Sequence, residues 1–258
     1  MRLSSAKILL VIGIITAAAS ARTEKLELGF PDEPAIGSGP GHFTNNNFRA
    51  AEMVLLDSGL TVTWQALPPR RMFRTLQTNP NDFCVAAVSI TAEREKLGQF
   101  SRPFAIDRML AVVGTKAHAS QLKQAHSLAE LIAIEGSSFV AIGELNYGRP
   151  TAPLLKQLGD RISHVPHSTG QVYDMLRAGR ADYGLVTQSV GASLLSVRSD
   201  RDDFILVSYP DMHRNSEMAF LCGAAVPAAV IASLNAAITR QLPRLRALFP
   251  DQALLPSD

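Results

Sequence analysis

Short apolar runs alternate along this chain with segments that have helical periodicity. The apolar runs are rich in β-branched residues and predict strands at 26–30, 61–67, 85–88, 138–142, 162–165 and 181–186. Capping residues, prolines and periodic apolar positions predict a helix that begins after Asn45 or Asn46 and ends at Ser58, and further helices at 69–76, 127–133, 150–158, 169–178 and 227–240. Strands that alternate with helices are typical of an α/β fold with mostly parallel sheets.

The N-terminal 21 residues have the composition of a secretory signal peptide. Arg2 and Lys7 precede an apolar run at 8–18, and Ala19, Ser20 and Ala21 form a small-residue cleavage site. The run is too short to span a bilayer, and no cysteine near the cleavage site could carry a lipid. We therefore expect an exported, periplasmic protein without a lipid anchor.

Charge gives little indication of a macromolecular partner. The formal net charge of the whole chain is +2, and removal of the signal peptide takes away two positive charges. A nearly neutral chain argues against a nucleic-acid or anionic-membrane surface. No nucleic-acid partner is expected.

The strongest candidate for ligand chemistry follows the predicted strand at 85–88. Thr91 is a good N-cap, and it places Arg94 in the first turn of a short helix, where N–H groups and the helix dipole favour an anion. An arginine there fits a carboxylate or phosphate that it shares with those N–H groups. The alternative is a solvated arginine paired with Glu93 or Glu95.

The residues SITAER (89–94), followed by FSRPF (100–104), resemble the signature of periplasmic solute-binding proteins of family 3, the receptors of polar amino-acid ABC importers. The resemblance implies that Arg94 grips a ligand carboxylate and that Ser89 and Thr91 line the same pocket. Ala87, Phe30 and Asp32 are also expected in the ligand-binding set.

This resemblance implies a two-lobed type II periplasmic-binding-protein fold, with each lobe a mostly parallel sheet flanked by helices. Two hinge strands would join the lobes, and the apolar runs at 104–114 and 204–208 are the expected outward and return crossings. The expected limits are 1–21 for the signal peptide, 22–108 with 209–258 for lobe 1, and 109–208 for lobe 2.

The second lobe should contribute the strand-to-helix turn formed by Asn146, Tyr147, Gly148 and Arg149. In α/β folds such turns bind ligands, and in this family the turn supplies backbone N–H groups. Capping and packing are the alternative roles for Tyr147 and Arg149. In lobe 1, Arg71 is a further candidate at a helix start, against the alternative of a solvent-exposed side chain.

One position departs from the amino-acid receptors. Thr187 stands where the resemblance places an Asp for the ligand ammonium, and a hydroxyl cannot pair with an ammonium in the same way. This departure predicts an acid that is not a standard free α-amino acid. Asp32, Glu33 or Glu144 could still supply the missing carboxylate from another direction.

Cys84 and Cys222 are the only cysteines. In an exported protein an even pair favours a disulfide over a metal site, and the resemblance places the two on strands of one sheet. The six histidines form no recognised ligand array, so no metal or cofactor is expected.

We expect a monomeric binding protein, not an enzyme, that holds a small anionic solute for an ABC importer. A periplasmic sensor that acts on a membrane partner is one alternative. The other is an enzyme like the cyclohexadienyl dehydratases, for which Asp32, Glu33, Glu144 and His42 are the acid or base candidates.

Overall fold

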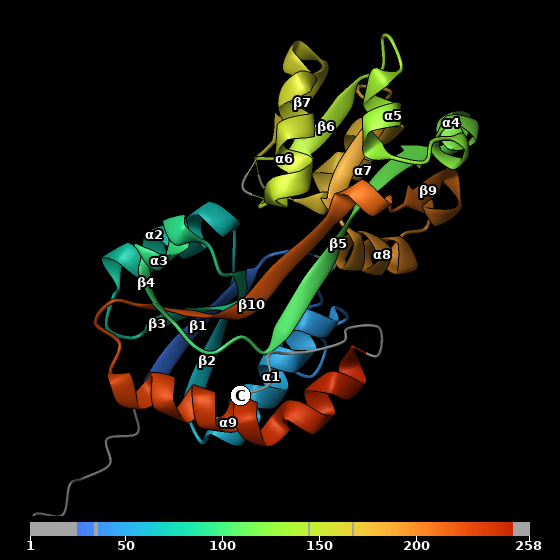
Figure 1. Cartoon of the computed structure of the whole chain (residues 1–258). Helices are drawn as coiled ribbons and strands as arrows, with labels where there is room; N and C mark the ends of the chain where they lie inside the picture. The colour runs from blue at the N-terminus through green and yellow to red at the C-terminus, as the bar shows by residue number, and fades with distance from the viewer. Residues whose placement is uncertain (1–24, 34–35, 144, 167, 250–258) are drawn as a thin grey trace, which may run out of the picture.

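The structure is a computed structural model and describes residues 25–33, 36–143, 145–166 and 168–249 (Figure 1). The expected signal peptide and Glu144 lie outside these residues. None of the helices in the described ranges combines the length and apolarity that a membrane span requires.

The elements alternate as the hydrophobic pattern predicts. The strands are β1 (Lys25–Pro31), β2 (Thr61–Leu67), β3 (Phe83–Ser89), β4 (Gly98–Phe100), β5 (Ala105–Thr115), β6 (Phe139–Ile142), β7 (Ile162–Val165), β8 (Tyr183–Thr187), β9 (Phe204–Val207) and β10 (His213–Gly223). The helices are α1 (Asn46–Ser58), α2 (Pro69–Thr78), α3 (Ala92–Glu95), α4 (Ala119–Gln124), α5 (Leu128–Ala133), α6 (Gly148–Gln157), α7 (Thr169–Arg177), α8 (Gln188–Val197) and α9 (Ala228–Leu248).

Local capping chemistry sets several helix boundaries. The Asn45 side chain accepts a hydrogen bond from the Asn47 N–H at the start of α1, and Gly59 ends that helix with φ 73°. Ser127 caps α5 in the same way, and Pro69 occupies the first turn of α2. These boundaries can be predicted from sequence because each depends on neighbouring residues alone.

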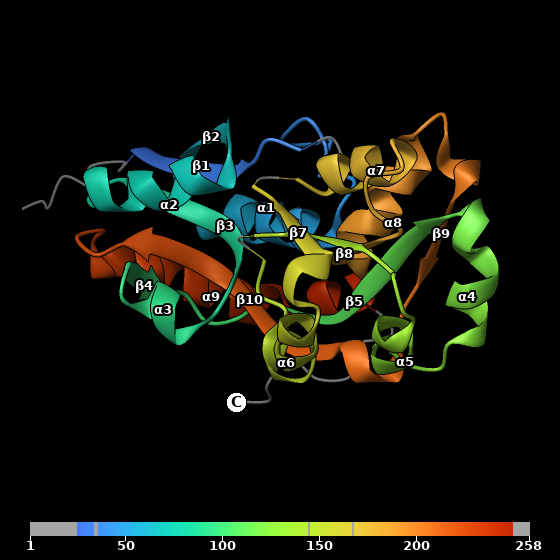
Figure 2. The same ribbon diagram turned by 90° about the horizontal axis from the view of Figure 1, so that it is seen from above.

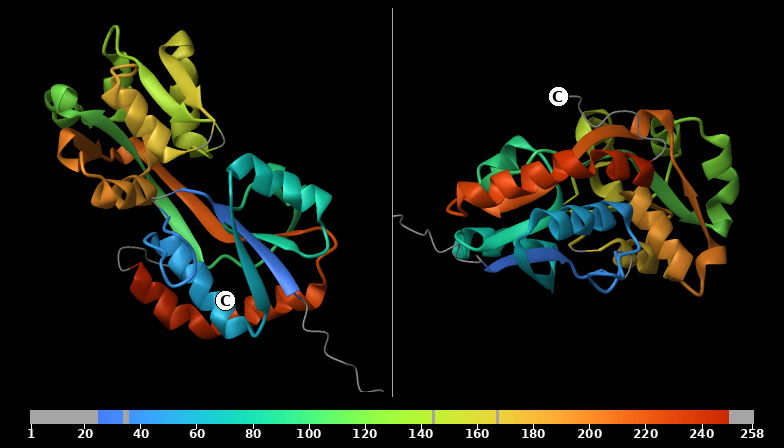
Figure 3. Two further views of the ribbon diagram at one scale, coloured as in Figure 1. Left: turned by 180° about the vertical axis from the view of Figure 1, so that it is seen from behind. Right: turned by 90° about the horizontal axis from the view of Figure 1, so that it is seen from below.

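Lobe 1 contains a parallel trio in the order β2-β1-β3, with β10 antiparallel to β3. One face of this sheet packs against α1 and α9 through Leu28, Cys84, Ala51 and Leu234. The other face packs against α2 through a smaller cluster that contains Met72, Leu76, Phe83 and Val85. Figure 3 shows α1 and α9 side by side on one side of the sheet, with α2 on the other.

Lobe 2 repeats the plan with the order β7-β6-β8, and β5 runs antiparallel to β8. Helices α7 and α8 contribute Tyr173 and Leu194 to the cluster on one face, and α5 and α6 contribute Leu131 and Leu155 to the cluster on the other. Seen from above, the two lobes lie at opposite ends of the molecule (Figure 2). The fold is therefore the expected two-lobed α/β architecture.

Strands β5 and β10 join the lobes. They lie antiparallel, with Ala105 opposite Met218 and Asp107 opposite Ser216, and β5 changes partner to β8 at Leu110. The prediction that residues 204–208 form the return crossing was wrong. Residues 204–207 form β9, which pairs with β5 inside lobe 2, and β10 makes the crossing. The predicted residue limits of the lobes stay a prediction.

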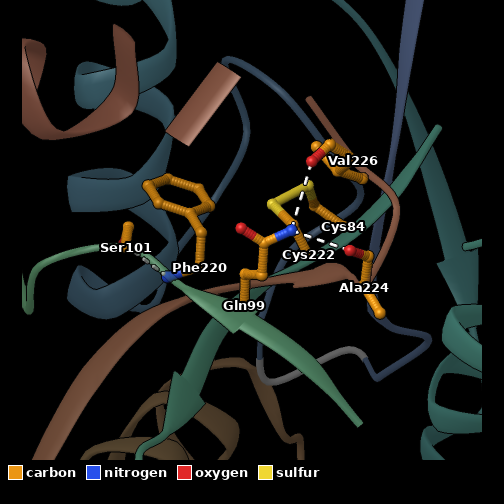
Figure 4. Close-up of a disulfide and its surroundings, with 7 residues drawn as sticks. All are labelled: Cys84, Gln99, Ser101, Phe220, Cys222, Ala224 and Val226. Atoms are coloured by element: carbon orange, nitrogen blue, oxygen red, sulfur yellow. Dashed lines mark hydrogen bonds between the residues drawn. A yellow bond between two sulfur atoms is a disulfide. The ribbon is translucent and has the colours of Figure 1, made fainter. Parts of the chain in front are cut away.

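A disulfide joins Cys84 on β3 to Cys222 on β10 (Figure 4). The two residues are register partners in the antiparallel ladder, and both side chains are fully buried. Beside them, the Gln99 amide on β4 donates to the carbonyl oxygens of Ala224 and Val226 at 2.9 and 3.2 Å. The disulfide thereby fixes the C-terminal end of β10 to β3 in the lobe 1 sheet.

Candidate functional site

A cavity of 170 Å³ lies between the lobes, at the carboxyl ends of β1 and β3. In open α/β sheets this edge is the usual position of a ligand, because loops and helix N-termini meet there. Both lobes and both crossing strands line it. Its polar residues are Glu33, Asn45, Asn47, Ser89 and Arg94 from lobe 1, Asp107 from β5, and Thr169 and Thr187 from lobe 2.

Arg94 lies at this cavity because the short helix α3 follows β3 directly. Thr91 caps the helix, and its hydroxyl accepts from the Arg94 N–H at 3.3 Å. The guanidinium donates to the Ser89 carbonyl at 3.1 Å and lies over the Phe73 ring, 5.0 Å from its centroid. These contacts fix a partly exposed cation at the cavity wall, where a carboxylate could bind.

A β-bulge shapes the wall below Arg94. Ala86 and Ala87 together lie opposite Phe220, because the β3–β10 register shifts between Ala219 and Leu221. Ala87 has φ 53°, which is costly for a residue with a side chain. Bulges redirect a strand locally and are frequent beside binding sites. Here Ala87 and Ser89 both line the cavity.

Two buried carboxylates lie on the same wall. Glu33, in the loop after β1, is 9% exposed, and its Oε1 accepts from the Thr169 N–H at 2.6 Å and the Gly170 N–H at 3.3 Å. Burial raises the pKa of the Glu33 carboxyl above its ordinary value, and the bonds from Thr169 and Gly170 oppose this rise. Because α7 belongs to lobe 2, Glu33 links the two lobes across the cavity.

Asp107 is 6% exposed and lies on β5, within the segment where the two crossing strands pair. It lines the cavity together with Met218 of β10. A carboxylate at this position is close to the hinge and faces the same space as Arg94. The cavity therefore contains groups of both charges.

Lobe 2 presents a mostly apolar surface. Ile142, Leu145 and Val190 cover the cavity from this side, with Thr169 and Thr187 as the polar contributors. Thr187 is buried at the end of β8. Its role in ligand binding stays a prediction.

The predicted turn at 146–149 lies beside the cavity and not on its wall. Asn146 accepts from the Gly148 N–H at 3.0 Å, and Gly148 has φ 71°. The Tyr147 hydroxyl accepts from the Ile142 N–H at 2.7 Å and donates to the Ile142 carbonyl at 3.1 Å. Asn146, Gly148 and Arg149 instead line an adjoining groove, opposite Thr91. The Tyr147 side chain is buried and bonds Ile142 at the end of β6, and ligand contact by this turn stays a prediction.

Four other predicted residues are not among the described lining residues of the cavity: Thr91, which lines the adjoining groove, and Arg71, Asp32 and Phe30. Arg71 and Asp32 are exposed. Phe30 is buried and makes edge contacts with Phe43 and Trp64, at centroid distances of 5.3 and 5.9 Å. Ligand contact by Arg71, Asp32 and Phe30 stays a prediction that the geometry of the cavity does not support.

Sequence reasoning missed Asp107, Asn45, Asn47 and Thr169 as site residues, and it named Glu33 only as one of several acid candidates and possible partners of a ligand ammonium. Asp107 interrupts the apolar run 104–114, and an acid inside such a run is a signal that could have been used. The asparagines at the start of α1 gave only a capping signal. In the described parts of the chain, no three His, Cys, Asp or Glu side chains converge to hold a metal ion.

Comparison with known proteins agrees with this architecture. Residues 48–150 match the family model of bacterial extracellular solute-binding proteins, family 3. No curated protein matches the sequence.

Among solved structures, an ancestral arginine-binding protein bound to glutamine is similar, with 16% identity and a TM-score of 0.68 over 88% of this chain and 98% of that one. The arginine-, lysine-, histidine-binding protein ArtJ from Geobacillus stearothermophilus has 13% identity and a TM-score of 0.68 over 88% and 94% of the chains.

A third similar structure is an ancestral amino acid-binding protein described as a precursor of cyclohexadienyl dehydratase. It has 16% identity and a TM-score of 0.64 over 88% and 94% of the chains. At these identities the structural likeness shows the fold, and the family match adds the sequence evidence. Over residues 48–150 the chain is therefore similar to the bacterial extracellular solute-binding proteins of family 3, and its fold is that of the similar solved structures.

Proposed function

We propose that this protein captures a small carboxylate-bearing solute in the cavity between its lobes and delivers it to an ABC importer. One observation carries the proposal. Arg94 is held by the Ser89 carbonyl and the Phe73 ring at the wall of a cavity that both lobes line. A cation fixed in this way is organised in advance for bidentate contact with a carboxylate.

The other charges of the cavity refine the solute class. Thr187 argued against a free α-amino acid because it replaces the aspartate expected for the ligand ammonium, but Glu33, one of the carboxylates left open as a substitute, lines the cavity together with Asp107. A solute with a carboxylate and a cationic or hydrogen-bond-donating group would match these charges. The similar structures include proteins bound to glutamine and to arginine, and amino-acid-like solutes therefore belong in the first screen.

Capture would proceed by closure of the lobes about β5 and β10. Segments that cross between domains absorb the backbone change in such hinge motions. The contact of Glu33 with the start of α7 would stabilise the closed form, because it joins a lobe 1 carboxylate to lobe 2 N–H groups. The solute would be enclosed without a covalent step.

An enzyme on this scaffold is the second candidate, and Glu33 is the observation that favours it. A buried carboxyl with a raised pKa is a typical general acid. Binding is still the better proposal, because Glu33 already accepts hydrogen bonds from Thr169 and Gly170 and these bonds join the two lobes. Incubation with prephenate tests the alternative, since a binding protein leaves it unchanged and a dehydratase forms product that depends on Glu33.

The main test is calorimetric titration of the chain without residues 1–21. The probes are the twenty amino acids, di- and tricarboxylates and short peptides, preceded by a thermal-shift screen. A solute at 100 times its Kd should add about 2.7 kcal/mol of stability. Arg94→Ala should then weaken binding by about 2 to 5 kcal/mol, because it leaves the carboxylate unpaired in a closed cavity.

Arg71→Ala is the matched control, since Arg71 also lies in the first turn of a helix but is exposed. It should change affinity less than about twofold. Unchanged affinity in Arg94→Ala would contradict the proposed anchor. Uptake of the solute by cells that lack the protein separates importer from sensor, because loss of uptake is expected only for an importer subunit.

A further inference from the structure

Of the two polar groups of the Asn45 side chain, only the amide oxygen has a hydrogen-bond partner within the described residues. It is the N-cap of α1 and is 1% exposed, and its Oδ1 accepts from the Asn47 N–H at 2.9 Å. This bond fixes the orientation of the amide, because Nδ2 could not accept it. The Nδ2 group has no hydrogen-bond partner within the described residues. A buried amide donor without an acceptor is rare and lowers stability.

The unpartnered donor belongs to the cavity. Asn45 lines it together with Asn47 and Phe48, at the start of a helix of 13 residues. The first turn of α1 contains no acidic residue, so no side chain there neutralises the positive end of the helix dipole. Both features favour an oxygen acceptor that enters the cavity at this point.

Asn45 and Arg94 approach the cavity from opposite faces of the lobe 1 sheet. The start of α1 belongs to the hydrophobic cluster that contains Phe48 and Ala86. Arg94 lies over Phe73, which packs against the cluster of α2 on the other face. A solute bound to Arg94 through its carboxylate could therefore extend across the sheet edge toward Asn45.

We propose that Asn45 is a second recognition point of this cavity, and that its Nδ2 donates a hydrogen bond to an uncharged carbonyl or hydroxyl oxygen of the solute. The inference rests on the proposed function and defines the solute further. A second anionic group is disfavoured, because Glu33 and Asp107 line the same cavity. The solute class is a small carboxylate with a neutral oxygen acceptor at a distance from the carboxyl group.

The fold itself does not require this amide. Serine and aspartate cap helices about as well as asparagine, and neither has the amide NH2 group that is unpartnered in Asn45. Asn45→Ser and Asn45→Asp should therefore keep the capping acceptor for the Asn47 N–H. This property separates a recognition role from a capping role.

The test compares probe pairs that differ in one oxygen acceptor, by calorimetry on the chain without residues 1–21. L-5-oxonorleucine is paired with L-norleucine, and 5-oxohexanoate is paired with hexanoate. In the unmodified protein the oxygen-bearing member of at least one pair should bind about 5- to 10-fold more tightly, the effect of one hydrogen bond. In Asn45→Ser, which adds no charge to the cavity, this ratio should fall to about one, with affinity for the other member unchanged.

Unfolding of the ligand-free Asn45→Ser protein provides the second measurement. Its midpoint should not fall, since the variant keeps the cap and removes an unsatisfied donor. A destabilised variant that keeps the probe ratio, or an equal loss for both members of a pair, overturns the inference. Arg94-dependent binding without preference for the oxygen-bearing probe overturns it too but leaves the proposed function standing. Absence of binding by every probe, including those of the wider screen, overturns both.

Discussion

The turn from β3 to α3 in lobe 1 and the turn from β6 to α6 in lobe 2 both connect the end of a buried strand to a helix. The first presents the guanidinium of Arg94 to the cavity, whereas the described part of the second presents Ile142 and Leu145. Their local sequences predicted the same role, because each has a polar residue and an arginine beside a helix start. The structures of the two turns differ in how the polar groups are used.

In lobe 2 the polar groups of the turn satisfy one another. Tyr147 bonds both the N–H and the carbonyl of Ile142, and Asn146 caps Gly148. In lobe 1 the Phe73 ring and the Ser89 carbonyl hold the guanidinium at the wall instead. A strand-to-helix turn therefore becomes a charged site only where neighbouring elements keep its side chain directed into the cavity.

The largest expected effect concerns the anchor of the lobe 1 turn. The disulfide between Cys84 and Cys222 joins residues separated by 138 positions. In the chain-entropy model, its removal by Cys84→Ser with Cys222→Ser should lower the free energy of unfolding by about 5 kcal/mol. Urea unfolding of the two proteins measures the difference. A loss below about 1 kcal/mol would show that the ladder alone fixes β3 to β10.

The next effect tests the turn at residues 146–149 of lobe 2, in which Asn146 and Tyr147 make hydrogen bonds to neighbouring backbone groups. Tyr147→Phe removes the partner of the Ile142 N–H and carbonyl and should cost about 1 to 3 kcal/mol of stability. Solute affinity should change less than about threefold, because Tyr147 is not among the described lining residues of the cavity. Tyr209→Phe is the control, since its hydroxyl donates only to the Leu122 carbonyl. A large loss of affinity in Tyr147→Phe alone would make this turn part of the binding site.

A smaller effect tests the support of Arg94. Phe73→Leu keeps an apolar side chain on α2, packed against the cluster that contains Met72 and Phe83, but removes the aromatic face below the guanidinium. We expect solute affinity to fall by about 0.5 to 1 kcal/mol, the usual contribution of a partly exposed cation–π contact. Calorimetry with a solute from the screen measures it, and the double variant with Arg94→Ala should show no further loss. Additive losses would mean that Phe73 contacts the solute directly.

The smallest expected effect is a change of pH dependence at the contact between the lobes. Because burial raises the pKa of Glu33 above 4.5, the folded protein holds this proton more tightly than the unfolded chain. The associated stability is fully present below about pH 4.5 and is lost as the pH rises through the raised pKa.

The side chain of Glu33→Gln cannot titrate, so this variant should not show the loss of stability. Asp107 and Arg94 line the cavity in both proteins, and their contributions therefore cancel in the comparison. The difference in free energy of unfolding between the two proteins is measured across this pH window. Parallel curves would show that the Glu33 carboxyl has the same pKa in the folded and unfolded chains.

Much of the fold was predictable because its causes are local. Thr91 and Ser127 cap helices through bonds to residues three positions away, and Gly59 adopts the left-handed conformation that ends α1. Such features depend on near neighbours and on side-chain chemistry. The position of Arg94 in the first turn after the Thr91 cap was predictable for the same reason.

The return crossing was not predictable in this way. The apolar run at 204–208 has the pattern of a buried strand, and β9 is such a strand, but pattern cannot show which partner it pairs with. The crossing β10 begins at His213 with a less apolar sequence. Strand pairing is decided by residues distant in the chain, which local periodicity does not record.

The sequence by itself determined the alternation of strands and helices, the cysteine pair and the arginine at the start of α3. Only the tertiary structure decided which polar residues face the cavity. Asp32 and Glu33 are adjacent acids, yet Asp32 is exposed and Glu33 is buried against the start of α7. The physical reason is that burial of a loop residue depends on what packs over it, and Glu33 is covered by Thr169 and Gly170, more than a hundred positions away in the chain.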